Sequence, residues 1–204
     1  MLNSNEKLGG IAGWSLPSCQ TCPGSSDLCR RLCYVQRYTN RFKIDYKDEL
    51  NLVESPGAFT KIKDLILATG SSVIRMHVSG DFYSRAYIRL WIRIVRALQG
   101  LRFYGYTRSW RVPRLWPVLA ELAVIPNVSL WASCDRETGI PDLGLKTAWL
   151  MENDQDPPPA PVDLVFRNYR KTKLFKAGGA LVCPHEFGIT PTKVTCLSCR
   201  RCYR

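Results

Sequence analysis

The stretch from Cys19 to Cys33 constrains this chain more than any other, because four cysteines lie within fifteen residues. Thiols at this density either form disulfides or bind a soft metal. The chain contains nine cysteines, an odd number, so disulfides cannot use all of them. No apolar run precedes a small-residue cleavage site, and no stretch approaches the ~20 apolar residues of a membrane-spanning helix. We therefore expect a cytoplasmic protein. Because disulfides are rare in the cytoplasm, we interpret the cysteines as metal ligands.

A second cysteine group at the C-terminal end is the most specific motif of the sequence. It combines Cys196-Leu-Ser-Cys199-Arg-Arg-Cys202 with an upstream Cys183-Pro184. Cys-x2-Cys-x2-Cys with a remote Cys-Pro is typical of [4Fe–4S] proteins, whereas zinc sites more often pair two separate Cys-x2-Cys knuckles. We therefore predict a [4Fe–4S] cluster here, with zinc as the alternative. Because the tail has no apolar face, we expect the metal to stabilise it.

The N-terminal group allows two interpretations. Its gaps of two, six and three residues are irregular for zinc and acceptable for a second cluster. Cys29 and Cys33 are spaced i, i+4, so a helix capped at Ser26 or the next residue would place both on one face. With all four thiols as ligands, the cluster is closed. With Cys22, Cys29 and Cys33 as the only ligands, one iron stays open to a small molecule and Cys19 is spare.

The chain is basic, with 29 Lys and Arg against 17 Asp and Glu and a formal net charge of +12. Such a surface favours polyanions, nucleic acid above all, although a merely soluble basic protein can have the same composition. The densest basic segment also carries two aromatic residues: Arg167, Tyr169, Arg170, Lys171, Lys173, Phe175 and Lys176. A nucleic-acid-binding protein with purely structural iron–sulfur or zinc sites is therefore the alternative function.

Strand-like and helix-like segments alternate along the chain, which favours parallel β-α-β units. The expected strands are residues 8–16, 73–81, 101–107, 128–134, 147–151, 162–167 and 180–183, and the expected helices begin near residues 56, 84 and 113. The strands alternate apolar and polar residues, whereas a doubly wound sheet is apolar on both faces. We predict a single α/β domain, an incomplete (β/α) barrel over residues 1–182 followed by a cysteine-rich, metal-binding tail over residues 183–204.

The polar row of the 73–81 strand marks the expected ligand site. Arg75, His77 and Ser79 alternate with apolar residues, so they should face the barrel interior, and Gly80 and Asp81 follow at its rim. Sites in closed barrels of this kind lie at the carboxyl ends of the strands. We therefore predict that these five residues line a pocket for a small molecule or cofactor. A later strand adds Ser129, Trp131 and Ser133 to the polar interior.

With these residues assembled, the chain resembles the Gene product 88 family of phages and plasmids. The resemblance rests on Gly10-Ile-Ala-Gly-Trp-Ser-Leu-Pro17, on His77-Val-Ser-Gly-Asp-Phe-Tyr-Ser84, on Tyr106-Thr-Arg-Ser-Trp110 and on the C-terminal cysteine tail. It covers nearly the whole chain and implies a protein of the bacterial host's cytoplasm. It also implies shared cysteines at Cys22, Cys29 and Cys33 but not at Cys19.

A more distant resemblance is to radical S-adenosylmethionine (SAM) enzymes, which have a partial barrel, a three-cysteine loop after the first strand and a Gly-Gly-Glu turn after the second. Ser79-Gly80-Asp81 stands at the analogous place here. The likeness implies SAM as a candidate ligand, with its amino group held by Asp81. The usual Cys-x3-Cys-x2-Cys motif is absent and Asp is shorter than Glu, so whether the chain is an enzyme stays open.

Overall fold

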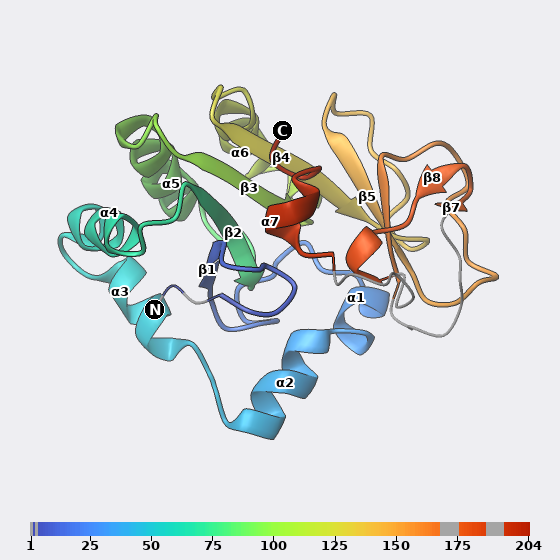
Figure 1. The fold of residues 1–204 in the computed structure, drawn as a ribbon, viewed down its shortest axis with the longest axis horizontal. Helices are drawn as coiled ribbons and strands as arrows, with labels where there is room; N and C mark the ends of the chain where they lie inside the picture. The colour runs from blue at the N-terminus through green and yellow to red at the C-terminus, as the bar shows by residue number, and fades with distance from the viewer. Residues whose placement is uncertain (1, 3, 168–175, 187–193) are drawn as a thin grey trace.

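Six parallel strands form one sheet in this computed structural model, which describes residues 2, 4–167, 176–186 and 194–204. They lie side by side in sequence order, β1 to β6 (Figure 1). Their bounds are β1 Ala12–Ser15, β2 Val73–Ser79, β3 Arg102–Thr107, β4 Val128–Cys134, β5 Lys146–Met151 and β6 Leu164–Arg167. A doubly wound sheet reverses its strand order part-way, and this one does not. The prediction of an α/β protein with parallel strands is confirmed.

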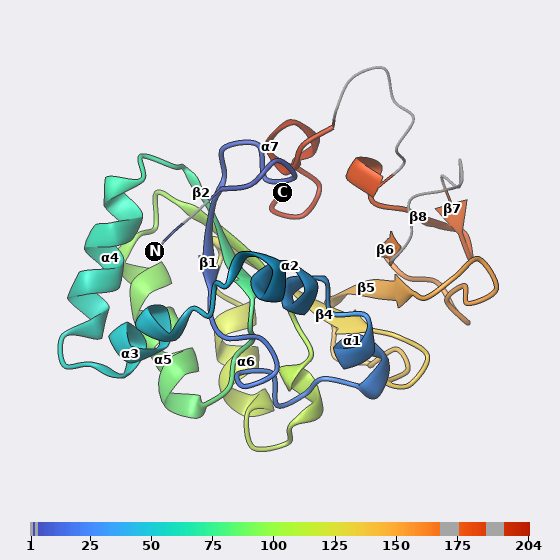
Figure 2. The same cartoon turned by 90° about the horizontal axis from the view of Figure 1, so that it is seen from below.

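The helices lie mainly on one side of this sheet. Figures 1 and 2 show α4, α5 and α6 against one face, and the C-terminal segment with α7 against the other. The helical elements are α1 Asp27–Arg31, α2 Tyr34–Phe42, α3 Lys47–Glu54, α4 Ala58–Ala68, α5 Arg85–Ala97, α6 Trp116–Ala123 and α7 Cys196–Cys199, with short 3-10 turns η1 Ser109–Arg111 and η2 Pro184–Glu186. A small antiparallel hairpin pairs β7 Lys176–Ala177 with β8 Ala180–Leu181.

Helix α5 shows how the sequence pattern builds the larger core. Ser84 caps it by accepting a hydrogen bond from the Tyr87 amide at 3.2 Å. Its apolar face is buried against β2, β3 and their neighbours, with Trp91 fully enclosed. The outward row holds Arg85, Arg89, Arg93 and Arg96. The amphipathic helix expected here is therefore confirmed.

The other face of the sheet is covered by the chain's own C-terminal tail. The Trp131 indole donates a hydrogen bond to the Cys202 carbonyl at 3.0 Å, and the Tyr104 ring lies 5.6 Å from that of Tyr203. Trp131 also donates to the Ser129 hydroxyl at 3.1 Å. The expected polar interior is thus filled by the tail rather than left as an open cavity. Sequence periodicity showed the two faces but could not show what would cover the inner one.

Strand β2 breaks the strict alternation that placed three polar residues on one face. It advances four residues, from Arg75 to Ser79, while its partner β1 advances two. At the irregularity, His77 has a left-handed φ of +64°. Its ring turns toward the helices and lies 4.4 Å from the Phe82 ring and 5.6 Å from the Tyr87 ring. The prediction that His77 shares the inner face with Arg75 is therefore wrong.

Several expected boundaries also shift. The helix expected near residue 56 begins at Ala58, because Gly57 caps it with a left-handed φ of +76°. Cys29 and Cys33 do not share a helix, since α1 ends after Arg31 and Cys33 caps α2. Of the segment expected as a strand at 180–183, residues 180–181 form β8 of the hairpin and Val182 forms a parallel bridge with Val165 of β6. Helices α2 and α3 were not expected from the sequence, although Tyr34, Tyr38 and Phe42 recur at helical spacing in α2.

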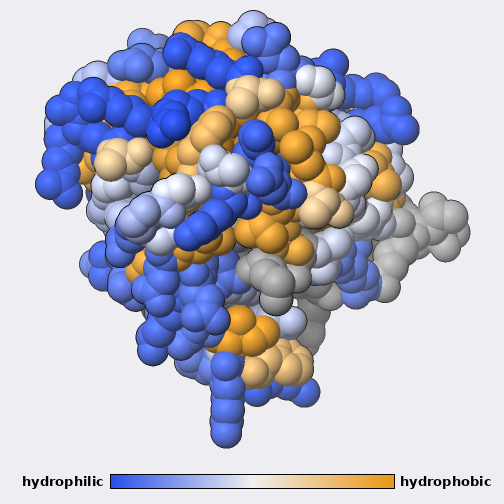
Figure 3. Space-filling view, turned by 90° about the vertical axis from the view of Figure 1, so that its left-hand side faces the viewer, coloured by the Kyte–Doolittle hydropathy of each residue, from blue (hydrophilic) through white to orange (hydrophobic). Residues whose placement is uncertain are grey.

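The surface mixes polar and apolar residues. Figure 3 shows hydrophilic and hydrophobic side chains intermingled on the flank that carries α3 and α4. Within the described ranges, no helix is both long and apolar enough to cross a membrane.

Candidate metal centres

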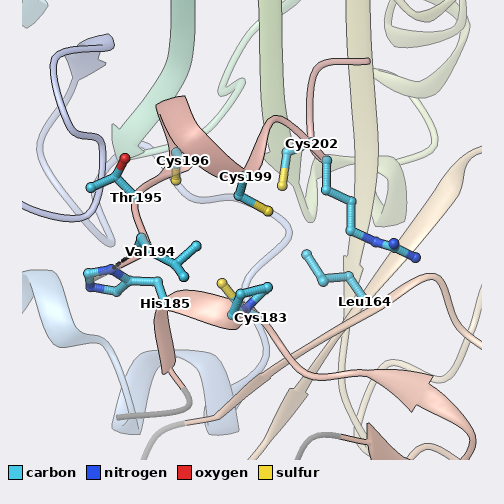
Figure 4. Close-up of a pocket in the computed structure, with 10 residues that line it drawn as sticks. Leu164, Cys183, His185, Val194, Thr195, Cys196, Cys199 and Cys202 are labelled. Carbon is cyan, nitrogen blue, oxygen red and sulfur yellow. Dashed lines mark hydrogen bonds between the residues drawn. The ribbon is translucent and has the colours of Figure 1, made fainter. Parts of the chain in front are cut away.

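The four C-terminal cysteines surround one pocket on the inner side of the sheet. Cys196 and Cys199 lie on α7, Cys202 follows it, and Cys183 lies at the start of η2. All four line the same pocket, together with His185 and Leu164 among others. Figure 4 shows their sulfur atoms directed into the space between α7 and η2. The structure thus brings together all four thiols that the spacing assigned to this site.

Local hydrogen bonds fix the loop that presents two of these thiols. Thr195 and Ser198 form a capping box at α7, in which the Thr195 hydroxyl accepts from the Ser198 amide at 3.2 Å and the Ser198 hydroxyl accepts from the Thr195 amide at 3.0 Å. The Cys196 amide donates to the Lys7 carbonyl at 2.7 Å. On the other side of the pocket, the Cys183 amide donates to the Val165 carbonyl at 2.8 Å. The tail is therefore held at both of its cysteine-bearing segments.

Polar groups of the sheet and the N-terminal segment surround this pocket. The Tyr106 hydroxyl lies 2.7 Å from the Cys202 sulfur. Burial raises the pKa of the Cys183 thiol to about 12, although the nearby Lys7 ammonium opposes that rise. Burial also raises the pKa of Cys202, whereas Tyr106 and Arg75 favour its thiolate. Without a metal, Cys183 and Cys202 are therefore neutral thiols. A thiolate at Cys183 would lie near the Lys7 ammonium, and one at Cys202 near the Arg75 guanidinium.

The N-terminal cysteines lie at the carboxyl ends of the strands, in the loop after β1. Burial raises the pKa of the Cys22 thiol, and the adjacent Asp81 raises it further. Burial likewise raises the pKa of Cys29, against the influence of Arg108. Cys19 has a left-handed φ of +64°, and its sulfur lies 3.0 Å from the Gln36 amide nitrogen. In this loop, Cys22 therefore lies near Asp81, which follows β2, and Cys29 lies near Arg108, which follows β3.

A buried ion pair under this loop was not predicted from the sequence. The Arg108 guanidinium lies 2.6 Å from the Asp135 carboxylate, and both side chains are almost fully buried. The Ser26 hydroxyl donates to the same Asp135 oxygen at 2.6 Å, while Ser26 also caps α1 by accepting from the Cys29 amide. Asp135 directly follows β4, and Asp81 lies two residues after β2. Their shared position near the carboxyl ends of parallel strands is the sequence feature that could have indicated this pair.

The predicted cofactor residues after β2 hold the cysteine loop itself. The Ser79 hydroxyl donates to the Leu16 carbonyl at 2.7 Å. Gly80 has a φ of +78°, and a Cβ there would lie 2.5 Å from the Thr21 hydroxyl, so the loop packs directly on it. Asp81 accepts hydrogen bonds from the chain's own donors: the Phe82 amide at 2.7 Å, the Thr107 hydroxyl at 2.6 Å and the Arg108 amide at 2.8 Å.

The remaining two cofactor candidates lie apart from one another. His77 is enclosed on the helix side, where its Nε2 lies 2.8 Å from the Tyr87 hydroxyl. Burial, helped by the Arg75 charge, lowers the pKa of His77 to about 3, so its ring is neutral. Arg75 faces the tail, with its guanidinium carbon 5.7 Å from the centre of the Tyr106 ring. Arg75 thus belongs to the C-terminal site and His77 to the core.

All nine cysteines carry free thiols in the structure. The four C-terminal thiols line one pocket, but across the described ranges no three His, Cys, Asp or Glu side chains are arranged as they would be around one metal ion. Of the predicted basic segment, Arg167 is buried and its amide donates to the Glu186 carboxylate at 2.7 Å, so it is not a surface phosphate contact. In the same basic segment, Lys176 is described, whereas Arg170, Lys171 and Lys173 lie outside the described residues.

Sequence comparison decides the family. The sequence model described as Gene product 88 matches residues 2–204. The chain belongs to the Gene product 88 family. The Gene 88 proteins of Mycobacterium phages D29 and L5 are each 26% identical to it over 150 residues, which is 65% of this chain. Those residues cover 60% and 61% of the two relatives, so the match spans about three fifths of their length. No solved structure matches the chain.

The segments that carry the Gene product 88 resemblance meet around the two cysteine groups. Pro17 and Leu16 lead into the N-terminal loop, which packs on Gly80. Tyr106 contacts Cys202 of the tail. Two positions later, Arg108 pairs with Asp135, the carboxylate that also binds Ser26 of the N-terminal cysteine loop. The predicted family membership is confirmed, whereas the likeness to radical SAM enzymes stays a prediction.

Proposed function

We propose that this chain is an iron–sulfur protein in which Cys183, Cys196, Cys199 and Cys202 hold a [4Fe–4S] cluster against the inner face of the sheet. The observation that carries the proposal is the convergence of these four thiols on one pocket. Four thiolates are the usual ligand set of such a cluster, which supplies one-electron transfer when bound. The alternative is a zinc ion bound by the same four thiolates, which predicts a colourless protein without acid-labile sulfide.

The surroundings of this pocket fit an anionic group. The Arg75 Nε is buried and makes no hydrogen bond to the described residues. A buried donor without a partner costs free energy, and acceptor sulfurs nearby would relieve that cost. The Tyr106 hydroxyl, already 2.7 Å from the Cys202 sulfur, would donate to the thiolate form. Hydrogen bonds of this kind stabilise a cluster's negative charge and tune its potential.

We infer a second cluster at the N-terminal group, held by Cys22, Cys29 and Cys33. These thiols lie at the carboxyl ends of parallel strands, where sites of (β/α) barrels are built. Cys19 is the fourth candidate ligand. Its left-handed backbone is unfavourable for a residue with a Cβ, and such strain is concentrated at functional sites. The substitution Cys19→Ala distinguishes the two arrangements. A cluster held by four cysteines would lose a ligand, whereas a cluster held by Cys22, Cys29 and Cys33 would keep all three of its ligands.

Variants of single cysteines test both clusters. Protein would be prepared anaerobically, and iron, acid-labile sulfide and zinc would be counted per chain. We expect Cys199→Ser and Cys29→Ser each to lose about half of the iron and sulfide. The matched control is Cys134→Ala, because that buried thiol belongs to neither group and lies 3.5 Å from the Ala148 carbonyl. Zinc in stoichiometric amounts, without sulfide, would contradict the proposal.

A radical-SAM-like reaction at the N-terminal cluster is a second candidate function, favoured by the position of Asp81 beside Cys22. A carboxylate offers about four acceptor positions, and the chain fills three of those of Asp81. The Ser109 hydroxyl also interacts with this carboxylate, so the amine of a bound ligand would have to replace Ser109 at the fourth position. Electron paramagnetic resonance of the reduced protein would be recorded with and without SAM. A SAM-dependent change with formation of 5′-deoxyadenosine is expected, and an unchanged spectrum without that product counts against it.

A further inference from the structure

Helix α2 presents a row of aromatic rings to solvent. Tyr34, Tyr38 and Phe42 are spaced i, i+4, i+8, and their exposed fractions are 58%, 49% and 55%. Since residues four apart lie on the same side of a helix, the three rings form one stripe. Val35 is the only residue of α2 that is buried. Figure 1 shows the helix projecting from the lower part of the molecule, away from the sheet and its covering helices.

A row of arginines runs beside the aromatic row. Arg37 and Arg41 follow Tyr34 and Tyr38 by three residues each, which places them on the adjacent strip of the helix. The Arg41 guanidinium lies 5.6 Å from the centre of the Phe42 ring, and the Tyr38 and Phe42 rings are 4.6 Å apart. The two rows therefore form one continuous surface, which we call the α2 face, made of Tyr34, Arg37, Tyr38, Arg41 and Phe42.

The position of the α2 face is fixed by contacts at the start of the helix. The Tyr34 hydroxyl donates to the Val78 carbonyl at 2.8 Å, which ties α2 to the end of β2. Gln36 contacts the sulfur of Cys19. An aromatic stripe that is held in place and left exposed is typical of a binding surface, because burying such rings is strongly favourable.

The charge of the surrounding segment indicates what binds there. Between residues 28 and 44 the sequence has no carboxylate and five cations: Arg30, Arg31, Arg37, Arg41 and Lys43. Of these, Arg31 pairs with Glu152 at 3.1 Å. A partner that is both anionic and able to stack on aromatic rings fits this surface. Single-stranded nucleic acid has both properties, whereas the paired bases of a duplex are not free to stack.

We propose that the α2 face binds single-stranded nucleic acid, with bases stacked on the aromatic row and phosphates contacted by the arginine row. A membrane surface fits less well, because the stripe lacks the aliphatic residues that insert among acyl chains and two of its three rings carry a hydroxyl. None of the five residues of the α2 face is a proposed metal ligand.

The aromatic row is tested by fluorescence anisotropy with a labelled oligothymidylate at low salt. The double substitution Tyr38→Leu with Phe42→Leu keeps the helix and its apolar character but removes both π-faces. Stacking on one aromatic ring is worth roughly 5- to 150-fold in affinity, so we expect a loss of at least about tenfold. Tyr38→Phe, which retains the ring, should bind like the wild type.

The arginine row is tested by the salt dependence of the same binding. Each phosphate contact on a single strand contributes roughly −0.7 to the slope of log affinity against log salt concentration, so Arg37→Gln with Arg41→Gln should reduce the slope by about 1.4. The matched control is Arg89→Gln with Arg96→Gln on the exposed face of α5, which removes the same charge from a surface without exposed aromatic residues. We expect that control to leave the slope near the wild-type value.

Other occupants of the α2 face give distinct results. Binding to anionic vesicles that survives the leucine substitutions, without binding to the oligothymidylate, would overturn the proposal in favour of a membrane surface. Concentration-dependent dimerisation abolished by those substitutions, again without DNA binding, would show instead that a second copy of the chain covers this face. Oligothymidylate binding that is unchanged in both double variants would also overturn it. The iron content of each variant serves as the check that the adjoining cysteine loop is intact.

Discussion

At the scale of single residues, His77 makes the protein's stability depend on pH. Its folded-state pKa of about 3 lies below the ordinary value of 6.5. Between these values the unfolded chain binds a proton that the folded chain does not, so stability falls as pH falls through this window, by about 1.4 kcal/mol per pH unit at most. Urea unfolding between pH 7 and pH 4 measures this. We expect His77→Gln to have a shallower pH dependence than the wild type, and parallel curves would contradict the assignment.

The buried pair of Arg108 and Asp135 carries a second prediction. Asp135→Asn keeps the shape of the side chain but leaves the Arg108 charge buried and unpaired, which costs about 3–5 kcal/mol of unfolding free energy. Because Asp135 also accepts from Ser26, the N-terminal loop should loosen and lose its iron. The control is Arg136→Gln, which breaks an exposed pair with Glu152 and should unfold like the wild type. Equal stability of the two variants would show that the buried pair does not support the loop.

Sequence reasoning at this scale located the cysteines but not all of their surroundings. Spacing alone grouped the C-terminal thiols, because metal ligands recur at short fixed intervals. It misplaced His77, since a strand irregularity reverses which face later residues occupy. It missed Asp135, whose partner Arg108 is 27 residues away, and single-sequence patterns carry no information on such long-range contacts.

At the scale of elements, the contact between the N-terminal cysteine loop and η1 depends on a glycine. A Cβ at Gly24 would lie 2.0 Å from the Arg108 carbonyl oxygen, which is backbone and can move only with its element. Gly24→Ala should therefore displace the loop, cost roughly 1–3 kcal/mol of stability and reduce iron binding at Cys22 and Cys29. Gly100→Ala is the matched control, because nothing lies within 4 Å of the added methyl group. Full iron content in Gly24→Ala would mean that this contact does not position the loop.

The regular elements followed from the sequence where their periodicity was strong. Strands β2 and β4 lie within two residues of their expected bounds, and helix α5 begins within one residue of its expected start, since each has a clear apolar face. Helix α2 was missed although Tyr34, Tyr38 and Phe42 recur at i, i+4 and i+8, a spacing that indicates one face of a helix. The tail's place on the inner face was also missed, because a segment with so little apolar sequence gives no periodic signal of packing.

At the scale of the whole molecule, the two cysteine groups should contribute differently to stability. The tail packs across the sheet through few apolar side chains, so metal binding has to replace much of the missing packing energy. We expect Cys199→Ser to lower the midpoint of thermal unfolding strongly. Cys29→Ser should remove a cluster but leave the sheet folded, because the α5 side of the core is independent of that loop. Equal loss of the folded state in both variants would refute this division of roles.

The roles proposed for the two cysteine groups all require that both groups hold iron and sulfide. The direct measurement is the content of iron, acid-labile sulfide and zinc in wild-type protein prepared anaerobically, with Mössbauer spectra to identify the cluster type. Two [4Fe–4S] clusters predict about eight iron and about eight sulfide per chain. Stoichiometric zinc, with no acid-labile sulfide, would contradict iron–sulfur binding at both cysteine groups.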